Sequence, residues 1–600
     1  MSSAVAAESC KRGNKNGHRG GGGGVADLED GISMSSSSRA RPSRSELGEQ
    51  GITPSICHIL SLFVSVTMFT SSIVLIQSLR SNQAICFVPR FTSNWSSIPT
   101  DSNTTLALPH SFSKEENFRQ PNDMAWLLKQ SRENGTNPCH NMRTRRSILL
   151  GLDHPTGAAE GGKNLRLQTD QDHELLLVSY TEDGDRRCSG GDFYETDLSG
   201  PRWRSRPPVK DIGDGSYLIT LNIKSSMAGL YAFKVVLLFA NLHGLDLRPD
   251  SWLLADEMIR LRIEFTNEFN STANSSLQLC DTPDFNRRSW KGRWTRTKSN
   301  ESCSADDEGR FKCLDPLERC DPPWCEGPLG GLESNGWVYS AHCAFRIFTL
   351  SEAWSCLAGK WLFFWGDSNH QDTIRNLLNF ILGRHEPNME RTFESTFSNS
   401  QNSSQLLKIT SHFNGHYEVS GNHLGLASLT NDEYRKRLES YFLPSNPIIP
   451  DAVILNSGLH DGGFWANLTH YAAGAEKATT FWGLVWRNSR SEASLRPRLL
   501  YRTTVAPAGF HRNQPANPQK MEVYNTVLGE MLVSEFGSDV LMTVDEYDMT
   551  FPWHFDNECS DGGHYGRPPS LHSWAGAEKG HQYFVDLMLA HTLLNALCPL

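Results

Sequence analysis

Residues 360–370 read KWLFFWGDSNH, so five large apolar side chains lead directly into Gly366-Asp367-Ser368. A continuous apolar run that ends at a glycine predicts a buried strand followed by a tight turn. Apolar residues then recur at intervals of three and four positions up to residue 382, which is typical of a helix. We therefore expect Ser368 at a strand-to-helix turn, with the positive end of a helix dipole behind its hydroxyl. Such a position suits a nucleophile.

The same alternation of apolar strands and helices continues to the end of the chain. We predict strands at 361–365, 451–456, 497–505 and 539–544, and helices at 371–383, 518–535 and 577–597. Continuous apolar strands separated by helices are typical of a parallel sheet in an α/β fold, whose ligands bind at the carboxyl ends of the strands. Ser368, Asn456 and Asp545 each follow a predicted strand. We therefore expect the active site at this edge of the sheet.

A serine nucleophile needs a base to accept its proton, an acid to orient that base and donors for the oxyanion. The turn Asp561-Gly-Gly-His564 is the best source of the base, because its glycines can bring both side chains to one side. Asp-x-x-His also begins at Asp170 and Asp367, so the motif alone is a weak signal. The alternatives without chemistry are a helix N-cap for Ser368 and a structural turn histidine for His564.

Four blocks of sequence narrow this interpretation: WVYSAHCAFRIFTLSEAWSCLAGKWLFFWGDSN, AVILNSGLHDGG, LLYRTTVAPAG and SDGGHYGRPPS. Together they resemble the PC-esterase domain of the NXPE (neurexophilin and PC-esterase domain) family and of the trichome birefringence-like plant glycan O-acetyltransferases. Both belong to the SGNH/GDSL hydrolase-like superfamily. The resemblance covers about residues 335–600. It implies an SGNH-type α/β fold over 336–600, with Ser368 as the nucleophile and Asp561 and His564 as its acid and base.

The second block departs from the SGNH pattern, because it reads Asn-Ser-Gly-Leu-His-Asp where Gly-x-Asn-Asp is expected. Asn456 is still a candidate oxyanion donor, and the backbone N–H of Ser368 is another. Gly366, His460 and Arg502 complete the residues that we predict to bind the oxyanion or the substrate. A salt bridge at the edge of the core is an equal alternative for Arg502.

Residues 165–265 consist of short alternating strands separated by Gly and Asp turns, which indicates a β-sandwich. The stretch VKDIGDGSYLITLNIKSSMAGLYAFKV, at 209–235, resembles the hallmark of a filamin-type immunoglobulin-like repeat. Gly215 suits a turn with positive φ, and Tyr217 suits a tyrosine packed at a strand entry. This domain would act either as a glycan- or partner-binding module or as a rigid spacer.

The chain before the sandwich divides into three predicted segments. Residues 1–55 are rich in Gly and Ser and predict a disordered cytosolic tail. Residues 56–79 hold no Asp, Glu, Lys or Arg and are long enough to cross a bilayer, so we predict a transmembrane signal anchor, with a buried core helix as the alternative. Residues 80–164 are rich in Ser, Asn, Thr and Pro and predict a stem or linker.

The chain after the anchor has the features of a lumenal domain in an oxidising compartment. Twelve of the 14 cysteines follow the anchor, five of them in a predicted cysteine-rich connector at 266–335. The absence of Cys-x-x-Cys there favours disulfides over a zinc site. Eight glycosylation sequons also follow the anchor, at Asn94, Asn103, Asn134, Asn270, Asn274, Asn300, Asn402 and Asn467.

These patterns predict a single-pass type II Golgi membrane protein whose lumenal domain is a carbohydrate O-acetyltransferase. A glycan O-acetyl esterase with the same triad is one alternative, and a non-catalytic glycan- or protein-binding protein of the secretory pathway is another. An acyl donor, such as acetyl-CoA or an acetylated intermediate, would be the co-substrate, and no metal or bound organic cofactor is implied. The net charge of −10 argues against nucleic acid as a partner and leaves a glycan substrate and the membrane.

Overall fold

The structure is a computed structural model, and it describes residues 124–133, 142–150, 165–267, 277–296, 304–305, 311–312, 337–384, 386, 389–415, 424–490, 492, 495–555, 562–565 and 583–599. All of these residues belong to one compact unit. The predicted cytosolic tail and the predicted anchor at 56–79 lie outside the described residues, as does Asp561. Within the described ranges, no helix combines the length and the apolar character needed to cross a membrane.

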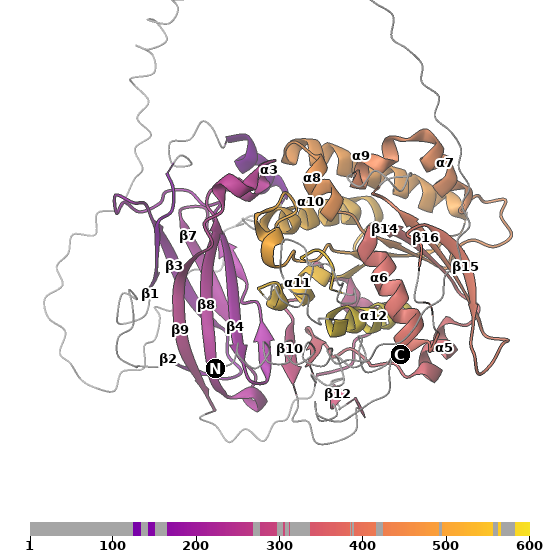
Figure 1. Cartoon of the computed structure of the whole chain (residues 1–600), viewed down its shortest axis with the longest axis horizontal. Helices are drawn as coiled ribbons and strands as arrows, with labels where there is room; N and C mark the ends of the chain where they lie inside the picture. Colours follow the sequence, from indigo (N-terminus) through magenta and orange to yellow (C-terminus); the bar gives the residue numbers. More distant parts are fainter. Residues whose placement is uncertain are drawn as a thin grey trace, which may run out of the picture. The chain divides into compact units, whose positions relative to one another are not determined.

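A six-stranded sheet forms the centre of the C-terminal part (Figure 1), in the order β15-β16-β14-β17-β18-β19. Its strands are β14 (Trp361–Gly366), β15 (Phe393–Ser398), β16 (Leu406–Phe413), β17 (Ala452–Leu455), β18 (Arg498–Arg502) and β19 (Leu541–Val544). All neighbours are parallel except β15 and β16. The four predicted strands are confirmed. The β15–β16 hairpin was not predicted, because Ser and Thr occupy much of it and no continuous apolar run marks it.

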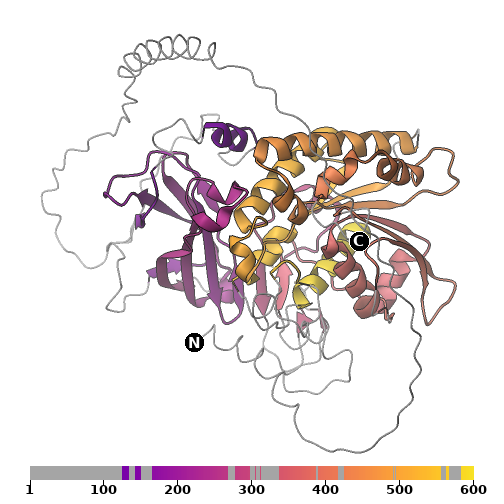
Figure 2. The same cartoon turned by 45° about the horizontal axis from the view of Figure 1, so that its top comes forward.

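Helices cover both faces of this sheet (Figure 2). They are α5 (Leu350–Leu357), α6 (Ser368–Asn376), η7 (Leu377–Ile381, a π-helical turn), α7 (Asp432–Ser440), α8 (Leu459–Phe464), α9 (Leu468–Ser489), α10 (Pro518–Phe536), α11 (Glu546–Thr550) and α12 (Tyr583–Leu597). Leu362 and Phe364 of β14 pack into the core that includes residues of α6 and α12. Phe363 and Trp365 pack into the core beneath α9 and α10. The run of five apolar residues therefore reflects a strand that is buried on both faces.

Two further sheets pack around one core and form a β-sandwich. The smaller sheet has the order β1-β3-β7-β6, and the larger has the order β13-β10-β5-β4-β8-β9-β2. Their strands are β1 (Arg146–Leu150), β2 (Leu165–Gln168), β3 (His173–Tyr180), β4 (Phe193–Gly200), β5 (Trp203–Ser205), β6 (Val209–Asp211), β7 (Ser216–Leu221), β8 (Gly229–Phe239), β9 (Asp256–Thr266), β10 (Arg293–Arg296) and β13 (Trp337–Ser340). The sheets thus extend beyond both ends of the range 165–265.

The turn that suggested the sandwich has the expected conformation. Gly215 has a φ of +83°, and a Cβ there would lie 2.4 Å from the carbonyl oxygen of Arg187. Tyr217 is fully buried, and its hydroxyl accepts the backbone N–H of Asp192 at 3.0 Å. The positive φ and the packed tyrosine are therefore both present at these positions, as the sequence predicted.

The first turn of α10 binds a loop of the sandwich through polar contacts. The Asn517 side chain donates to the carbonyl of Gly244 at 2.7 Å, and the Gly244 N–H donates to Gln519 at 2.8 Å. The ammonium group of Lys520 donates to the carbonyl of Asp246 at 2.8 Å. Apolar side chains of both parts, including Phe239 of β8, share the core under α10. The sandwich and the C-terminal part therefore form a continuous packed structure.

Candidate active site

Ser368 is the first residue of α6, and a single residue, Asp367, separates it from the carboxyl end of β14. Asp367 is the N-cap of this helix, and its carboxylate accepts the N–H of Asn369 at 2.9 Å. In the sheet, β14 lies between β16 and β17. The chain continues from β14 to β15 and β16 on one side of it and then to β17, β18 and β19 on the other side. Ser368 therefore lies at a topological switch point of the sheet. The predicted strand-to-helix turn is therefore present, at the place where α/β folds bind ligands.

The hydroxyl of Ser368 lies 2.6 Å from Nε2 of His564, a residue 196 positions later in the chain. Three contacts hold the turn that carries this histidine. Asn369 donates to the carbonyl of Gly563 at 3.2 Å, the N–H of Ala508 donates to the carbonyl of Gly562 at 2.8 Å, and the Tyr565 hydroxyl donates to the carbonyl of Ala506 at 2.8 Å. Nε2 can accept the serine proton when the ring hydrogen is on Nδ1, which is the arrangement that a general base needs.

Asp561, the predicted acid, lies outside the described residues, and its role stays a prediction. His370, the histidine nearest to Ser368 in sequence, is buried beneath the turn. Its ring packs edge-on against Phe364, with 5.4 Å between ring centroids. Burial lowers the pKa of His370 well below its usual value, and Arg502 lowers it further, so the ring is neutral. His564, and not His370, contacts the serine hydroxyl.

Gly366 provides the space that His370 occupies. A Cβ at Gly366 would lie 2.4 Å from Nδ1 of that ring, so any side chain there would displace it. The carbonyl of Gly366 accepts the N–H of Asn414, at the end of β16, at 2.9 Å. The structure thus places Gly366 beneath the turn that carries Ser368, as a packing residue.

Asn456 lies at the end of β17, next to the turn, but its amide is engaged within the protein. It donates to the carbonyl of Arg502 at 3.1 Å and to the hydroxyl of Thr504 at 3.3 Å. The backbone N–H of Ser368 hydrogen-bonds no other described residue and points from a helix N-terminus. The N–H of Gly415, one residue beyond the Asn414–Gly366 contact, likewise has no partner among the described residues. These two N–H groups are therefore better candidates for oxyanion donors than the amide of Asn456. Gly415 was missed because the strand before it, β16, was not predicted.

His460 and Asp461 lie in the first turn of α8. The half-buried ring of His460 packs edge-on against Phe413, with 5.3 Å between centroids. Asp461 is fully buried, and it accepts the Ser457 hydroxyl, the Trp465 indole N–H at 2.7 Å and a backbone N–H at 2.9 Å. Burial raises the pKa of Asp461 to about 6, although these hydrogen bonds oppose the shift. Asp461 thus anchors the loop that follows β17.

The guanidinium of Arg502 forms a buried ion pair with Glu546. Nε and Nη2 of Arg502 each lie 2.6 Å from an oxygen of that carboxylate. This is the salt bridge that the sequence left open as an alternative to substrate binding. Burial raises the pKa of Glu546 to about 7; Arg502 opposes this shift, and Asp586 and Asp367 add to it. We call Arg502, Glu546, Asp586 and Asp367 the site floor.

Asp586 of α12 contacts the helix that carries the nucleophile. Its carboxylate accepts the hydroxyl of Thr373 at 2.7 Å and the amide of Asn376, both in α6. The disulfide between Cys356 and Cys598 joins α5 to the end of α12. Sequence analysis missed Asp586, because a single acidic residue in an apolar helix gives no sign of what it contacts.

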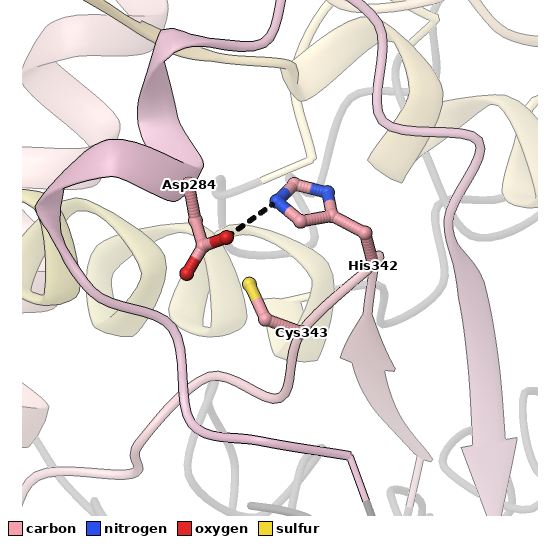
Figure 3. Close-up of side chains that lie close together, drawn as sticks. All are labelled: Asp284, His342 and Cys343. Carbon is pink, nitrogen blue, oxygen red and sulfur yellow. Dashed lines mark ion pairs between the residues drawn. The ribbon is translucent and has the colours of Figure 1, made fainter.

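Asp284, His342 and Cys343 gather close together (Figure 3), with His342 Nε2 3.4 Å from an oxygen of Asp284. The sulfur of Cys343 is bonded to Cys280, so it is not a thiolate that could bind a metal. Two disulfides join pairs of described cysteines, and Cys188 is also disulfide-bonded, which confirms the prediction of disulfide bonds. Two predicted glycosylation sites, Asn402 and Asn467, lie on exposed residues, and the other six lie outside the described residues.

No protein-family model matches the chain, and no curated protein sequence matches it. Several solved structures are similar to part of it, including two esterases. One is an acetylxylan esterase from Geobacillus stearothermophilus, with 14% identity over 40% of this chain and 96% of that chain and a TM-score of 0.24. The other is a tryptophan-to-isoleucine variant of that esterase, with 14% identity over 40% of this chain and 95% of that chain and a TM-score of 0.23. At these TM-scores the likeness carries no inference about activity.

Proposed function

We propose that the chain is a carbohydrate O-acetyltransferase that forms an acyl-enzyme on Ser368. The 2.6 Å contact between the Ser368 hydroxyl and His564 Nε2, at the switch point of a parallel sheet, is the observation that carries this proposal. A serine whose hydroxyl is hydrogen-bonded to an imidazole at a helix N-terminus has the arrangement needed for acyl transfer. The four sequence blocks resemble glycan O-acetyltransferases, and on this basis we propose acetyl as the acyl group and a glycan as the substrate.

In the first half of the reaction, Ser368 Oγ attacks the carbonyl carbon of the acyl donor while His564 takes the hydroxyl proton. The N–H groups of Ser368 and Gly415 donate to the oxyanion that forms. When this intermediate collapses, the leaving group departs with the proton from His564. In the second half, a sugar hydroxyl gives its proton to His564 and attacks the acyl carbon. Ser368 then leaves and recovers the proton.

A glycan O-acetyl esterase would use the same residues with water in place of the sugar. The structure offers one observation that supports transfer over hydrolysis, since Ser368 is only 5% exposed. Limited access of water to the acyl-enzyme lengthens its lifetime until an acceptor binds. The two disulfides support an oxidising compartment, and we propose the Golgi lumen as the location, with residues 56–79 as the anchor.

Incubation of the full-length chain with a labelled acetyl donor and a panel of glycans tests the proposal. We expect label on sugar with the wild type, and a loss of roughly 10⁴-fold or more in the Ser368→Ala variant, because the nucleophile is removed. Ser411→Ala is the matched control, because Ser411 is a buried serine of the same sheet whose hydroxyl donates to the carbonyl of Arg391 at 3.1 Å.

Three outcomes of this assay would change the proposal. Label found only as free acetate would replace the transferase with the esterase. Undiminished transfer by Ser368→Ala would remove the mechanism. Glycan binding without either product would favour the non-catalytic binding protein.

A further inference from the structure

A glutamate of the sandwich holds the loops next to the catalytic histidine. Glu195 is in the middle of β4, and its side chain is completely buried. Its carboxylate accepts Nε of Arg512 at 3.0 Å and also Nη2 of that residue. One of its oxygens lies 2.7 Å from Nε2 of His554. Arg512 and His554 belong to the C-terminal part, 317 and 359 positions later in the chain. We call Glu195, Arg512 and His554 the interface cluster.

The carboxylate of Glu195 is ionised within the interface cluster. Burial alone would raise the pKa of Glu195, but attraction to His554 and Arg512 lowers it to about 2. Both ring nitrogens of His554 contact acceptors, because Nδ1 also contacts the carbonyl of Phe551. Burial lowers the pKa of His554, and Glu195 opposes this shift. One buried carboxylate therefore holds a guanidinium and an imidazole from two different segments.

Hydrogen bonds connect the segments of Arg512 and His554 to the turn that carries His564. The carbonyl of His554 accepts the N–H of Gly509, at the start of the 3-10 helix η10 (Gly509–Asn513) that contains Arg512. The preceding residue, Ala508, donates its N–H to the carbonyl of Gly562 at 2.8 Å. A Cβ on Gly562 would lie 2.3 Å from the ring of His511, so the turn rests closely on η10. His564 follows two residues after Gly562.

We propose that Glu195 is a positioning residue for His564, so that the sandwich completes the active site. This inference rests on the proposed function, since Glu195 can position the catalytic base only if His564 is that base. Glu195 acts through the interface cluster and η10, which set the position of the turn at 562–564. A displacement of about 1 Å at a reacting group can cost on the order of 100-fold in rate. A module that fixes this position therefore contributes to catalysis without touching the substrate.

A second ion pair between the same two parts provides the matched control. Arg206 follows β5 in the sandwich, and its guanidinium lies 2.7 Å from the carboxylate of Glu522 in α10. This pair joins the sandwich to a helix that makes none of the described contacts with the turn at 562–565. Glu522→Gln removes one interface carboxylate, as Glu195→Gln does, and leaves η10 untouched.

The test measures how fast a fluorophosphonate probe labels Ser368 in the full-length chain, across a range of pH. This readout needs no glycan, and it reports how well His564 activates the serine. We expect Glu195→Gln to lower the plateau rate by roughly 10- to 100-fold and to change the pH profile. We expect Glu522→Gln to stay within about threefold of the wild type, since its partly exposed ion pair contributes little.

Urea unfolding of each variant separates positioning from stability. A slow Glu195→Gln variant with a wild-type pH profile and a lower unfolding midpoint would overturn the inference, as would equal labelling rates in Glu195→Gln and wild type. If Glu195→Gln does not fold, Arg512→Gln replaces it, because that side chain is 21% exposed and should show the same slow labelling. A wild-type chain that is not labelled would overturn both proposals. A labelled chain that acetylates no glycan would overturn only the proposed function.

Discussion

Two buried glutamates, one in the interface cluster and one in the site floor, differ in their charge balance. Glu195 and Glu546 each accept two hydrogen bonds from one arginine. Nevertheless, the pKa of Glu195 is lowered to about 2 and that of Glu546 is raised to about 7, from the same ordinary value of 4.5. Burial pushes both values upward. The attraction of Arg512 and His554 overcomes burial at Glu195, whereas Arg502 does not overcome it at Glu546.

The total charge around each pair explains the difference. The interface cluster has one carboxylate, and both Arg512 and His554 contact it. The site floor has three carboxylates for one guanidinium, because Asp586 and Asp367 add to Glu546. An excess of buried acidic groups costs folding free energy. Such strongly shifted pKa values cluster at functional sites. The ionised Glu195 therefore joins the sandwich to the C-terminal part, whereas Glu546, with its raised pKa, lies in the site floor beside the candidate active site.

Removal of the single cation of the site floor should have the largest effect. Arg502→Met leaves the carboxylate of Glu546 buried without its partner, and Asp586 and Asp367 lose a compensating charge. We expect the free energy of unfolding to fall by roughly 3–5 kcal/mol, which is typical when one member of a buried pair is removed. Urea denaturation followed by tryptophan fluorescence measures this loss.

The double variant Arg502→Met/Glu546→Gln is the control for that measurement. It removes both charges, so we expect it to be more stable than Arg502→Met alone. Equal stability of the single and double variants would mean that the stranded charge of Glu546 is not the cause of the loss.

The pH dependence of stability should also differ between the two clusters. Because the pKa of Glu546 is raised from 4.5 to about 7, its contribution is fully present below pH 4.5 and is lost as the pH rises to about 7. The loss amounts to about 3 kcal/mol in total. We expect Glu546→Gln to flatten the stability profile between these pH values, as measured by urea unfolding at a series of pH. An unchanged slope in the variant would count against the raised pKa.

The sequence predicted the strand-to-helix turn at Ser368 because the signal was local. The apolar run of β14 and the helical period after Ser368 are adjacent in the chain, so their pattern could be read directly. His564 was predicted as the partner of Ser368 because a compact Asp-x-x-His turn and a family resemblance pointed to the same residue, and the two side chains are in contact. Side-chain partners far apart in sequence were not predictable. Nothing in the sequence of β4 indicates that Glu195 contacts residues more than 300 positions later. The ion pair between Arg502 and Glu546 was not predictable either, because it depends on which face of the sheet each side chain occupies.

Weakening the interface cluster should produce the smallest effect and should depend on pH in the opposite direction. The depressed pKa of Glu195 contributes stability above pH 4.5, and this contribution is lost as the pH falls to about 2. Arg512→Gln removes the guanidinium but leaves the contact with His554, and the arginine side chain is 21% exposed. We therefore expect a loss of about 1–2 kcal/mol at pH 7, less than for Arg502→Met, as measured by urea unfolding. Below a pH of about 2 the variant and the wild type should converge, because the carboxylate is then largely protonated in both. The same loss at pH 7 and at low pH would instead assign the effect to packing of the arginine stem, and the charge comparison between the two clusters would fail.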